Sequence, residues 1–284
     1  MANSSEILDS ILNKPPEAPD PIIYQFLVPN KKGVNNFLTT YNKQNTSSAS
    51  DPLTPPPSPK AESAGSAAPA VELSIFTAAT ETFTRKNTNC SIAESLERFA
   101  PIFDLGRDNN LKVRAYISVA LGCPYEGPDV DPHKVANLAV TLLEMGADEI
   151  SVADTTGMGT APKTRELLKV LAAAGVDIHD LALHFHDTYG QALVNTVVGL
   201  EAGVRTFDAA VGGLGGCPYS PGATGNVATE DLVHLFESLG LRTGVDLLRL
   251  AEVGEWISKE VGRSNESRAG KASLAQMRRF KKDA

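Results

Sequence analysis

The segment Leu181–Val211 reads LALHFHDTYGQALVNTVVGLEAGVRTFDAAV and decides the fold class. Its first five residues and its last six, Thr206–Val211, are short apolar runs typical of β-strands. Between them Gln191–Ala202 places apolar residues every three or four positions, which predicts an amphipathic helix. Strands joined by one crossover helix run parallel, and such connections are right-handed. The segment is therefore predicted to form one strand-helix-strand unit of a parallel sheet.

The same alternation of predicted strands and amphipathic helices recurs along most of the chain. Further strands are predicted at Ile22–Val28, Val71–Thr77, Leu111–Val119 and Glu149–Ala153, and further helices at Ala93–Phe103, Val135–Gly146, Thr164–Ala174 and Glu230–Leu239. Small and bulky residues alternate in the strands, which favours a barrel interior, although a doubly wound sheet has the same order of elements. We predict an α/β protein of the TIM (β/α)8-barrel class, with about six units where a closed barrel needs eight.

Composition divides the chain into four parts. Most of the 18 prolines precede residue 70, and the stretch from Thr46 to Ala70 has no apolar period. We predict an N-terminal segment with one strand-helix unit at 1–45, a disordered Pro/Ser-rich insertion at 46–70, the main part of the barrel at 71–266 and a basic tail at 267–284.

Charge and residue usage narrow the possible partners. A net charge of −8 argues against nonspecific nucleic-acid binding. The sequence contains no stretch of about 18 apolar residues, the length a membrane-spanning helix needs. The first 20 residues lack both the apolar core of a signal peptide and the Arg-rich composition of a transit peptide. Cys90, Cys123 and Cys217 lie far apart, which disfavours a disulfide framework or a thiolate zinc site and indicates a reducing compartment.

Two histidines stand at the end of the strand Leu181–Phe185. Residues two apart in a strand share a face, so His184 and His186 can point into one site. Two neutral imidazoles suit a divalent metal, and barrel active sites gather at the carboxyl ends of strands. A pair of core histidines held by hydrogen bonds is the alternative.

A glycine-rich stretch, Gly212–Asn226, follows the strand Thr206–Val211. Its glycines allow close approach to a ligand or loop movement. Cys217, set among them, looks positioned for chemistry, with an incidental thiol as the alternative. Asn226 offers an amide oxygen to a metal or, equally well, a cap to the helix that follows.

Asp154 ends the strand Glu149–Ala153, again at a carboxyl end. It could bind metal, orient water or accept a proton from a substrate. A turn-forming or helix-capping aspartate is the alternative.

Five stretches together resemble the 3-hydroxy-3-methylglutaryl-CoA lyases, which share a metal-dependent barrel superfamily with the isopropylmalate and homocitrate synthases. The stretches are FTAATETFTRKNTNCSIAES from Phe76, ALGCPYEG from Ala120, EISVADTTGMGT from Glu149, HFHDTYGQALVNT from His184 and GGLGGCPYSPGATGNVATEDLV from Gly212. The likeness runs from about Val71 to Lys271. The GGLGGCPY loop is what separates the lyases from the synthases.

The resemblance implies cleavage of 3-hydroxy-3-methylglutaryl-CoA to acetyl-CoA and acetoacetate, a step of leucine breakdown and ketone-body formation. The implied ligands of Mg²⁺ or Mn²⁺ are His184, His186 and Asn226, and the implied catalytic residues are Cys217, Asp154 and Glu230. It further implies a small-molecule acyl-CoA substrate, a homodimer and a mitochondrial matrix location, with cytoplasm or peroxisome as alternatives. For the tail we expect a frayed, solvated terminus rather than contact with CoA phosphates.

The chain departs from the family pattern at its start. The family's first strand carries an Arg-Asp pair that supplies a further metal ligand and stabilises the developing anion. The Arg107-Asp108 pair here lies on a predicted helix and is no substitute. Because MANSSEIL resembles family sequence shortly after the second strand, we expect Met1 to be an internal methionine of a longer protein.

Two other functions fit the sequence. An isopropylmalate- or homocitrate-type synthase would share the histidine pair but would be much less affected by Cys217→Ala than a lyase. A catalytically dead partner of a full-length lyase would show no metal-dependent stabilisation and would co-purify with that enzyme.

We predict that the chain, expressed alone, is poorly soluble and essentially inactive as a lyase. An open barrel exposes strand edges, and a charge placed at the developing anion contributes several kcal/mol to catalysis. Assay of acetoacetate release by the purified chain checks this. Release at rates ordinary for the family would contradict it.

Overall fold

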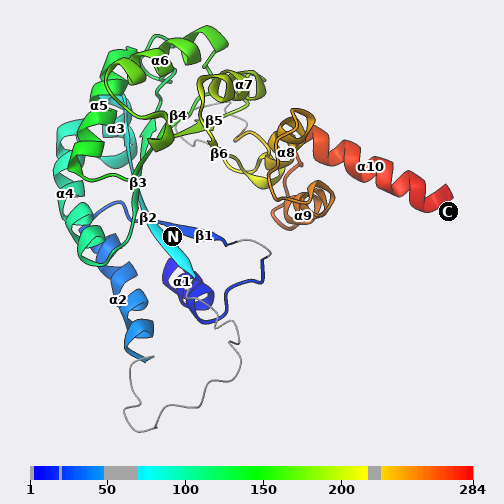
Figure 1. The fold of residues 1–284 in the computed structure, drawn as a ribbon, viewed down its shortest axis with the longest axis horizontal. Helices are drawn as coiled ribbons and strands as arrows, with labels where there is room; N and C mark the ends of the chain where they lie inside the picture. The colour runs from blue at the N-terminus through cyan, green and yellow to red at the C-terminus, as the bar shows by residue number, and fades with distance from the viewer. Residues whose placement is uncertain (1–2, 19–20, 48–68, 217–224, 284) are drawn as a thin grey trace. The chain divides into compact units, whose positions relative to one another are not determined.

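The computed structural model describes residues 3–18, 21–47, 69–216 and 225–283, and its strands form one six-stranded sheet (Figure 1). The strands are β1 (Ile23–Leu27), β2 (Ala70–Ala78), β3 (Val113–Ser118), β4 (Glu149–Asp154), β5 (Leu181–Phe185) and β6 (Thr206–Asp208). Every predicted strand is confirmed, with small shifts at its ends.

One or more helices follow each strand. The helices are α1 (Ser4–Asn13), α2 (Lys31–Ser47), α3 (Glu81–Thr88), α4 (Ile92–Asp108), α5 (Pro132–Met145), α6 (Ala161–Ala173), α7 (Ala192–Ala202), α8 (Thr229–Ser238), α9 (Leu247–Glu260) and α10 (Arg268–Asp283), with short 3₁₀ turns η1 (Ile178–Asp180) and η2 (Val211–Gly213). The five predicted helices correspond to α4 to α8. Within the described ranges, no helix has the length and apolar character needed to cross a bilayer.

The strand order separates the two α/β architectures that the sequence left open. Strands β1 to β6 lie in chain order across the sheet, and the pairs β1–β2, β4–β5 and β5–β6 are parallel. A doubly wound sheet reverses its strand order at a switch point, whereas a barrel adds each strand beside the last. The topology is that of the barrel class, with six of its strands present.

Contacts divide the chain into two compact units. The first comprises residues 1–75 and 97–114, and the second comprises residues 76–96 and 115–284. In the first, α1 packs on α2, and Phe37 of α2 contacts the rings of Phe26 and Tyr41. In the second, α5, α6 and α7 pack in succession beside β4 and β5 (Figure 1).

The edges of the predicted insertion are ordered elements. Helix α2 continues to Ser47 and β2 begins at Ala70, so both enter the range 46–70 that was predicted to be disordered. Residues 48–68 lie outside the described residues.

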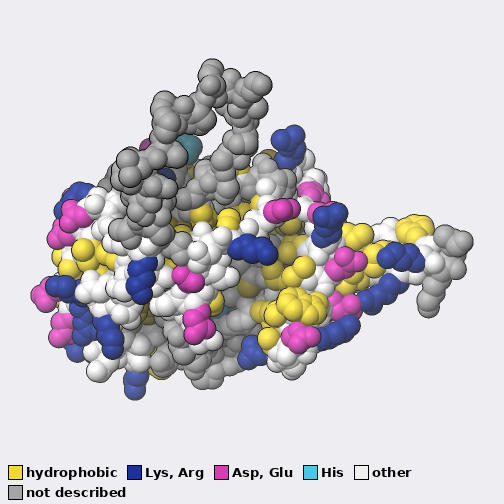
Figure 2. Space-filling model, turned by 90° about the horizontal axis from the view of Figure 1, so that it is seen from below, with side chains coloured by type: hydrophobic (Ala, Val, Ile, Leu, Met, Phe, Trp, Pro, Cys, Tyr) yellow, Lys and Arg dark blue, Asp and Glu magenta, His cyan; other side chains and the backbone are white. Residues whose placement is uncertain are grey.

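The expectation of a frayed C-terminus is wrong, because Arg268–Asp283 forms α10, which packs on α8 and α9. The buried carboxylate of Asp231 in α8 accepts hydrogen bonds from the Ser267 hydroxyl and from the N–H groups of Arg268 and Ala269. These contacts satisfy the free N–H groups at the start of α10, and Leu274 buries its apolar face. Lys and Arg side chains line this helix at the right of Figure 2.

Candidate functional site

The two predicted histidines lie side by side in the second unit. His184 is in β5 and His186 follows its end, and their ring centroids are 5.3 Å apart. His186 is only 5% exposed. Burial, with a smaller contribution from the charge of His184, lowers the pKa of His186 to about 4. The His186 ring is therefore neutral near pH 7 and can offer a lone pair.

A carboxylate that sequence reasoning missed orients His184. The Nδ1 atom of His184 lies 3.3 Å from Oδ2 of Asp208, its register partner on β6. The Ser151 hydroxyl on β4 donates to the same Oδ2 at 2.8 Å. A carboxylate on Nδ1 favours the tautomer that leaves the lone pair on Nε2. The only sequence signal for Asp208 was its position near the end of a predicted strand.

Asn226 lies against the backbone of His186, with which it forms an isolated antiparallel bridge. Its Nδ2 donates to the Leu214 carbonyl at 2.9 Å. The alternative role as a helix cap is wrong, because α8 begins at Thr229 and its N-cap residue is Ala228. Asn226 is thus held by the strand ends rather than by the helix.

Two of the buried polar atoms that have no hydrogen-bond partner belong to predicted metal ligands. They are Nδ1 of His186 and Oδ1 of Asn226. Burying such atoms without hydrogen bonds costs free energy, which a cation would recover. Within the described ranges no three His, Cys, Asp or Glu side chains form a metal-binding group, so a cation held by the two histidines would need a donor of another kind, such as the Asn226 amide oxygen. Two imidazoles and an amide oxygen fit a divalent cation.

Asp154, at the end of β4, is fully buried in the turn that follows it. Its Oδ2 accepts from the Gly159 N–H at 2.9 Å, and its Oδ1 lies 3.4 Å from the Thr156 hydroxyl. Burial raises the pKa of Asp154 to about 6, against the opposing effect of these hydrogen bonds. A carboxyl group with a pKa near neutrality is suited to proton transfer.

Glu230 occupies the first turn of α8 with its side chain buried. Its carboxylate accepts from the Gly212 N–H at 2.9 Å, and a Cβ added at Gly254 would overlap it. Burial raises the pKa of Glu230. Its described contacts join the start of the glycine-rich stretch to α8, and no described contact links it to either histidine.

Of the three cysteines, two lie in the described part of the chain and one does not. Cys217, the predicted general acid, lies outside the described residues. Cys90 and Cys123 are buried, and the Cys123 thiol lies 3.3 Å from the Thr80 hydroxyl. The sulfur of Cys123 is therefore packed against α3 rather than presented to a ligand.

A polar pocket of about 480 Å³ adjoins Asn226 in the second unit. Its lining includes Asp187, Tyr189, Glu266 and Arg268, and the Arg268 guanidinium lies 3.3 Å from the Asp187 carboxylate. The C-terminal helix thus brings a basic side chain to the loop that follows the histidines.

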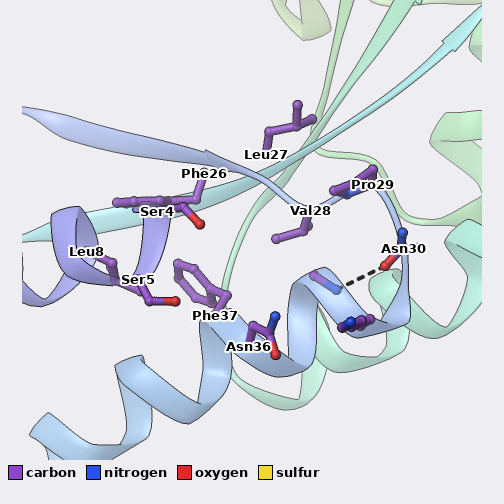
Figure 3. Close-up of a pocket in the computed structure, with 12 residues that line it drawn as sticks. Ser4, Ser5, Leu8, Phe26, Leu27, Val28, Pro29, Asn30, Asn36 and Phe37 are labelled. Carbon is purple, nitrogen blue, oxygen red and sulfur yellow. Dashed lines mark hydrogen bonds between the residues drawn. The ribbon is translucent and has the colours of Figure 1, made fainter. Parts of the chain in front are cut away.

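The first unit has a separate pocket of about 240 Å³ between α1, β1 and α2 (Figure 3). Phe26 and Phe37 line it together with Ser4, Ser5 and Asn36. Its lining contains no carboxylate or imidazole. The Asn30 side-chain oxygen in this lining accepts a hydrogen bond from the Gly33 N–H. This pocket therefore offers no carboxylate or imidazole for acid-base chemistry.

Comparison with known proteins gives one family. A family model described as HMGL-like matches residues 57–257. A 3-hydroxy-3-isohexenylglutaryl-CoA/hydroxy-methylglutaryl-CoA lyase of Pseudomonas aeruginosa is 49% identical over 97% of this chain and 80% of its own length. The mitochondrial hydroxymethylglutaryl-CoA lyase of Rattus norvegicus is 50% identical over 73% of this chain and 63% of its own length.

Solved structures agree with these relatives. A hydroxymethylglutaryl-CoA lyase from Pseudomonas aeruginosa superposes with a TM-score of 0.81 and 42% identity, covering 97% of this chain and 80% of that one. An HMG-CoA lyase from Acinetobacter baumannii, in complex with coenzyme A and 3-methylmalate, has a TM-score of 0.77 and 30% identity, over 95% of this chain and 77% of that one.

Replacing Asp208 by asparagine should weaken Mn²⁺ binding by about 10- to 100-fold, because a carboxylate on Nδ1 of a metal-binding histidine orients the ring and raises its basicity. Isothermal titration with Mn²⁺ measures the affinity. Asp246→Asn, at the exposed cap of α9, is the control and should bind like the parent chain. Equal affinities of Asp208→Asn and the parent would contradict the role given to Asp208.

Asp154→Asn should stabilise the metal-free protein at pH 8 by roughly 1–3 kcal/mol. The pKa of Asp154 in the folded state, about 6, lies above its ordinary value of 3.8, so the native state holds this proton more tightly than the unfolded state. Stability from this residue is therefore lost as pH rises from about 4 to 6. Urea unfolding in EDTA at pH 8 and pH 4.5 should show the advantage of the variant only at pH 8, and a pH-independent difference would contradict it.

Proposed function

The chain belongs to the HMGL-like family, alongside the hydroxymethylglutaryl-CoA lyases, and we propose that its own site cleaves 3-hydroxy-3-methylglutaryl-CoA to acetyl-CoA and acetoacetate. The observation that carries the proposal concerns two buried atoms able to ligate a metal, Nδ1 of His186 and Oδ1 of Asn226. Neither has a hydrogen-bond partner, and the neighbouring His184 is oriented by Asp208.

The residues proposed to hold Mg²⁺ or Mn²⁺ are His184, His186 and Asn226. When bound, the cation supplies Lewis acidity toward the hydroxyl and carboxylate oxygens of the substrate. Asp208 keeps the His184 lone pair on Nε2, and burial keeps His186 neutral. The His186 ring therefore presents a donor atom that need lose no proton to bind.

Proton transfer is proposed for Asp154 and Cys217. The 3-hydroxyl must lose a proton for the C2–C3 bond to break, and the resulting acetyl-CoA carbanion must gain one. Burial places the pKa of Asp154 near 6, which suits it to exchange protons at neutral pH. The resemblance of the GGLGGCPY loop supports Cys217 as the acid. For Glu230, bonded to the Gly212 N–H, the contacts support a role in positioning that loop.

An acyl-CoA substrate is supported by the relative whose structure holds coenzyme A. The name of the Pseudomonas aeruginosa relative adds 3-hydroxy-3-isohexenylglutaryl-CoA as a second substrate to assay. A homodimer and a mitochondrial matrix location are proposed from the family; relatives named mitochondrial and cytoplasmic both occur, in Rattus norvegicus and Danio rerio.

The proposal is tested first by metal binding and then by turnover. Mn²⁺ should raise the melting temperature of the parent chain and of His179→Ala, whose histidine is exposed in η1, but not that of His186→Ala. The metal-free melting temperature of each variant shows whether it folds. Equal stabilisation of His186→Ala would refute the ligand assignment.

Turnover is measured as acetyl-CoA and acetoacetate formed by the same three proteins and by Cys217→Ala, over several decades of rate. We expect slow formation that EDTA and His186→Ala abolish, and loss of the lyase reaction in Cys217→Ala. Condensation of acetyl-CoA with a keto acid that survives Cys217→Ala would favour a synthase. Absence of both metal-dependent stabilisation and turnover would favour the catalytically dead partner.

A further inference from the structure

One fully buried amide outside the proposed metal and proton-transfer groups reaches toward Asp154. Asn195 lies in α7 with 0% exposure, and its Nδ2 donates to the Gly159 carbonyl at 3.0 Å. The N–H of the same glycine donates to Asp154 Oδ2 at 2.9 Å. A single residue of the turn therefore links the Asn195 amide to the Asp154 carboxylate.

The Asn195 side chain carries a cost in stability. Its Oδ1 is buried and has no hydrogen-bond partner, and asparagine is a poor residue for a helix interior. An apolar side chain of similar size would avoid both penalties but would leave the buried Gly159 carbonyl without its donor. The polar contribution of this side chain is therefore its bond to Gly159, which ties the turn to α7.

The turn from Asp154 to Gly159 is anchored from two sides. Gly157 adopts a φ of +73°, and a Cβ at Gly159 would stand 2.6 Å from Asp154 Oδ2, so the turn requires glycine at both positions. Thr155 accepts from the Val119 N–H, and Thr156 donates to the Gly122 carbonyl, which fixes the turn toward the end of β3. The bond from Asn195 fixes it from the α7 side.

Helix α7 is itself tied to the segment that carries His186. The Asp187 carboxylate accepts from the Ala192 N–H at 3.0 Å, in the first turn of α7. One helical turn further along, Asn195 holds Gly159. The helix is thus a rigid spacer between the proposed metal ligands and the proposed acid.

We propose that Asn195 is a positioning residue that fixes the Asp154 carboxylate relative to His186 through the Gly159 turn. The inference rests on the lyase function proposed above for its effect on rate, but not for its effect on the turn.

The test compares Asn195→Leu with Thr196→Val in the full chain. Leucine keeps most of the volume and removes both the donor and the unpartnered acceptor. Thr196 is equally buried in the same helix, and its hydroxyl donates to the Ala192 carbonyl within α7, so its loss leaves the turn untouched. Asn195→Ala serves as a second variant if leucine does not fit.

Asn195→Leu should fold, with a melting temperature moderately below that of the parent because the buried Gly159 carbonyl loses its donor. We expect unchanged Mn²⁺ affinity, and kcat lower by roughly 10- to 100-fold with KM nearly unchanged. The Gly159 amide, followed by NMR with ¹⁵N-glycine, should exchange with solvent at least tenfold faster than in Thr196→Val. Parent-like kcat and Gly159 exchange in both Asn195 variants would overturn the proposal. The proposal would also be overturned if Thr196→Val and both Asn195 variants lost stability and kcat to the same extent.

The amide measurement separates this inference from the proposed function. If the parent chain shows no turnover, the lyase proposal fails, and faster Gly159 exchange in Asn195→Leu still supports the anchor. If the parent turns over and Gly159 exchange is unchanged, the positioning role fails and the lyase function stands.

Discussion

The parallel register of β4, β5 and β6 is the constraint on which the site depends. It sets His184 directly opposite Asp208 on one neighbouring strand and opposite Ala153 on the other. Register partners in a parallel pair project to the same face of the sheet, so the strands alone bring the Asp208 carboxylate next to the His184 imidazole. A shift of one residue would turn the whole set of side chains to the opposite face. The apolar core residues of these strands, which include Ile150 and Leu181, therefore help to keep His184 and Asp208 together by fixing the register.

Several groups of the site are buried at a cost in stability. Asp154 and Glu230 have raised pKa values and His186 a lowered one, and burial is the largest cause in each case. A fold selected only for stability would place apolar residues at these positions. Strained and desolvated groups of this kind cluster where chemistry is performed, because a dry site strengthens the electrostatic interactions within it.

The first turn of α8 connects the site to the C-terminal part of the chain. Glu230 binds the Gly212 N–H, and the adjacent Asp231 binds the start of α10. The carbonyl of Gly212 also accepts from the N–H of Glu266, in the segment that leads into α10. The basic C-terminal segment is therefore part of the support for the glycine-rich stretch, which its charge alone did not suggest.

The sequence by itself determined the strands, helices α4 to α8 and the pairing of His184 with His186, because strand alternation and helical period are local properties of the chain. The contacts of Asn226, Asp208 and Asn195 were decided only in three dimensions. The local pattern after the glycine-rich stretch fitted either a cap or a ligand, and the structure excludes the cap, because Ala228 holds that position. Asp208 and Asn195 contact partners on other elements, 24 and 36 residues away. Such contacts depend on strand register and helix packing, which no periodicity in the sequence encodes.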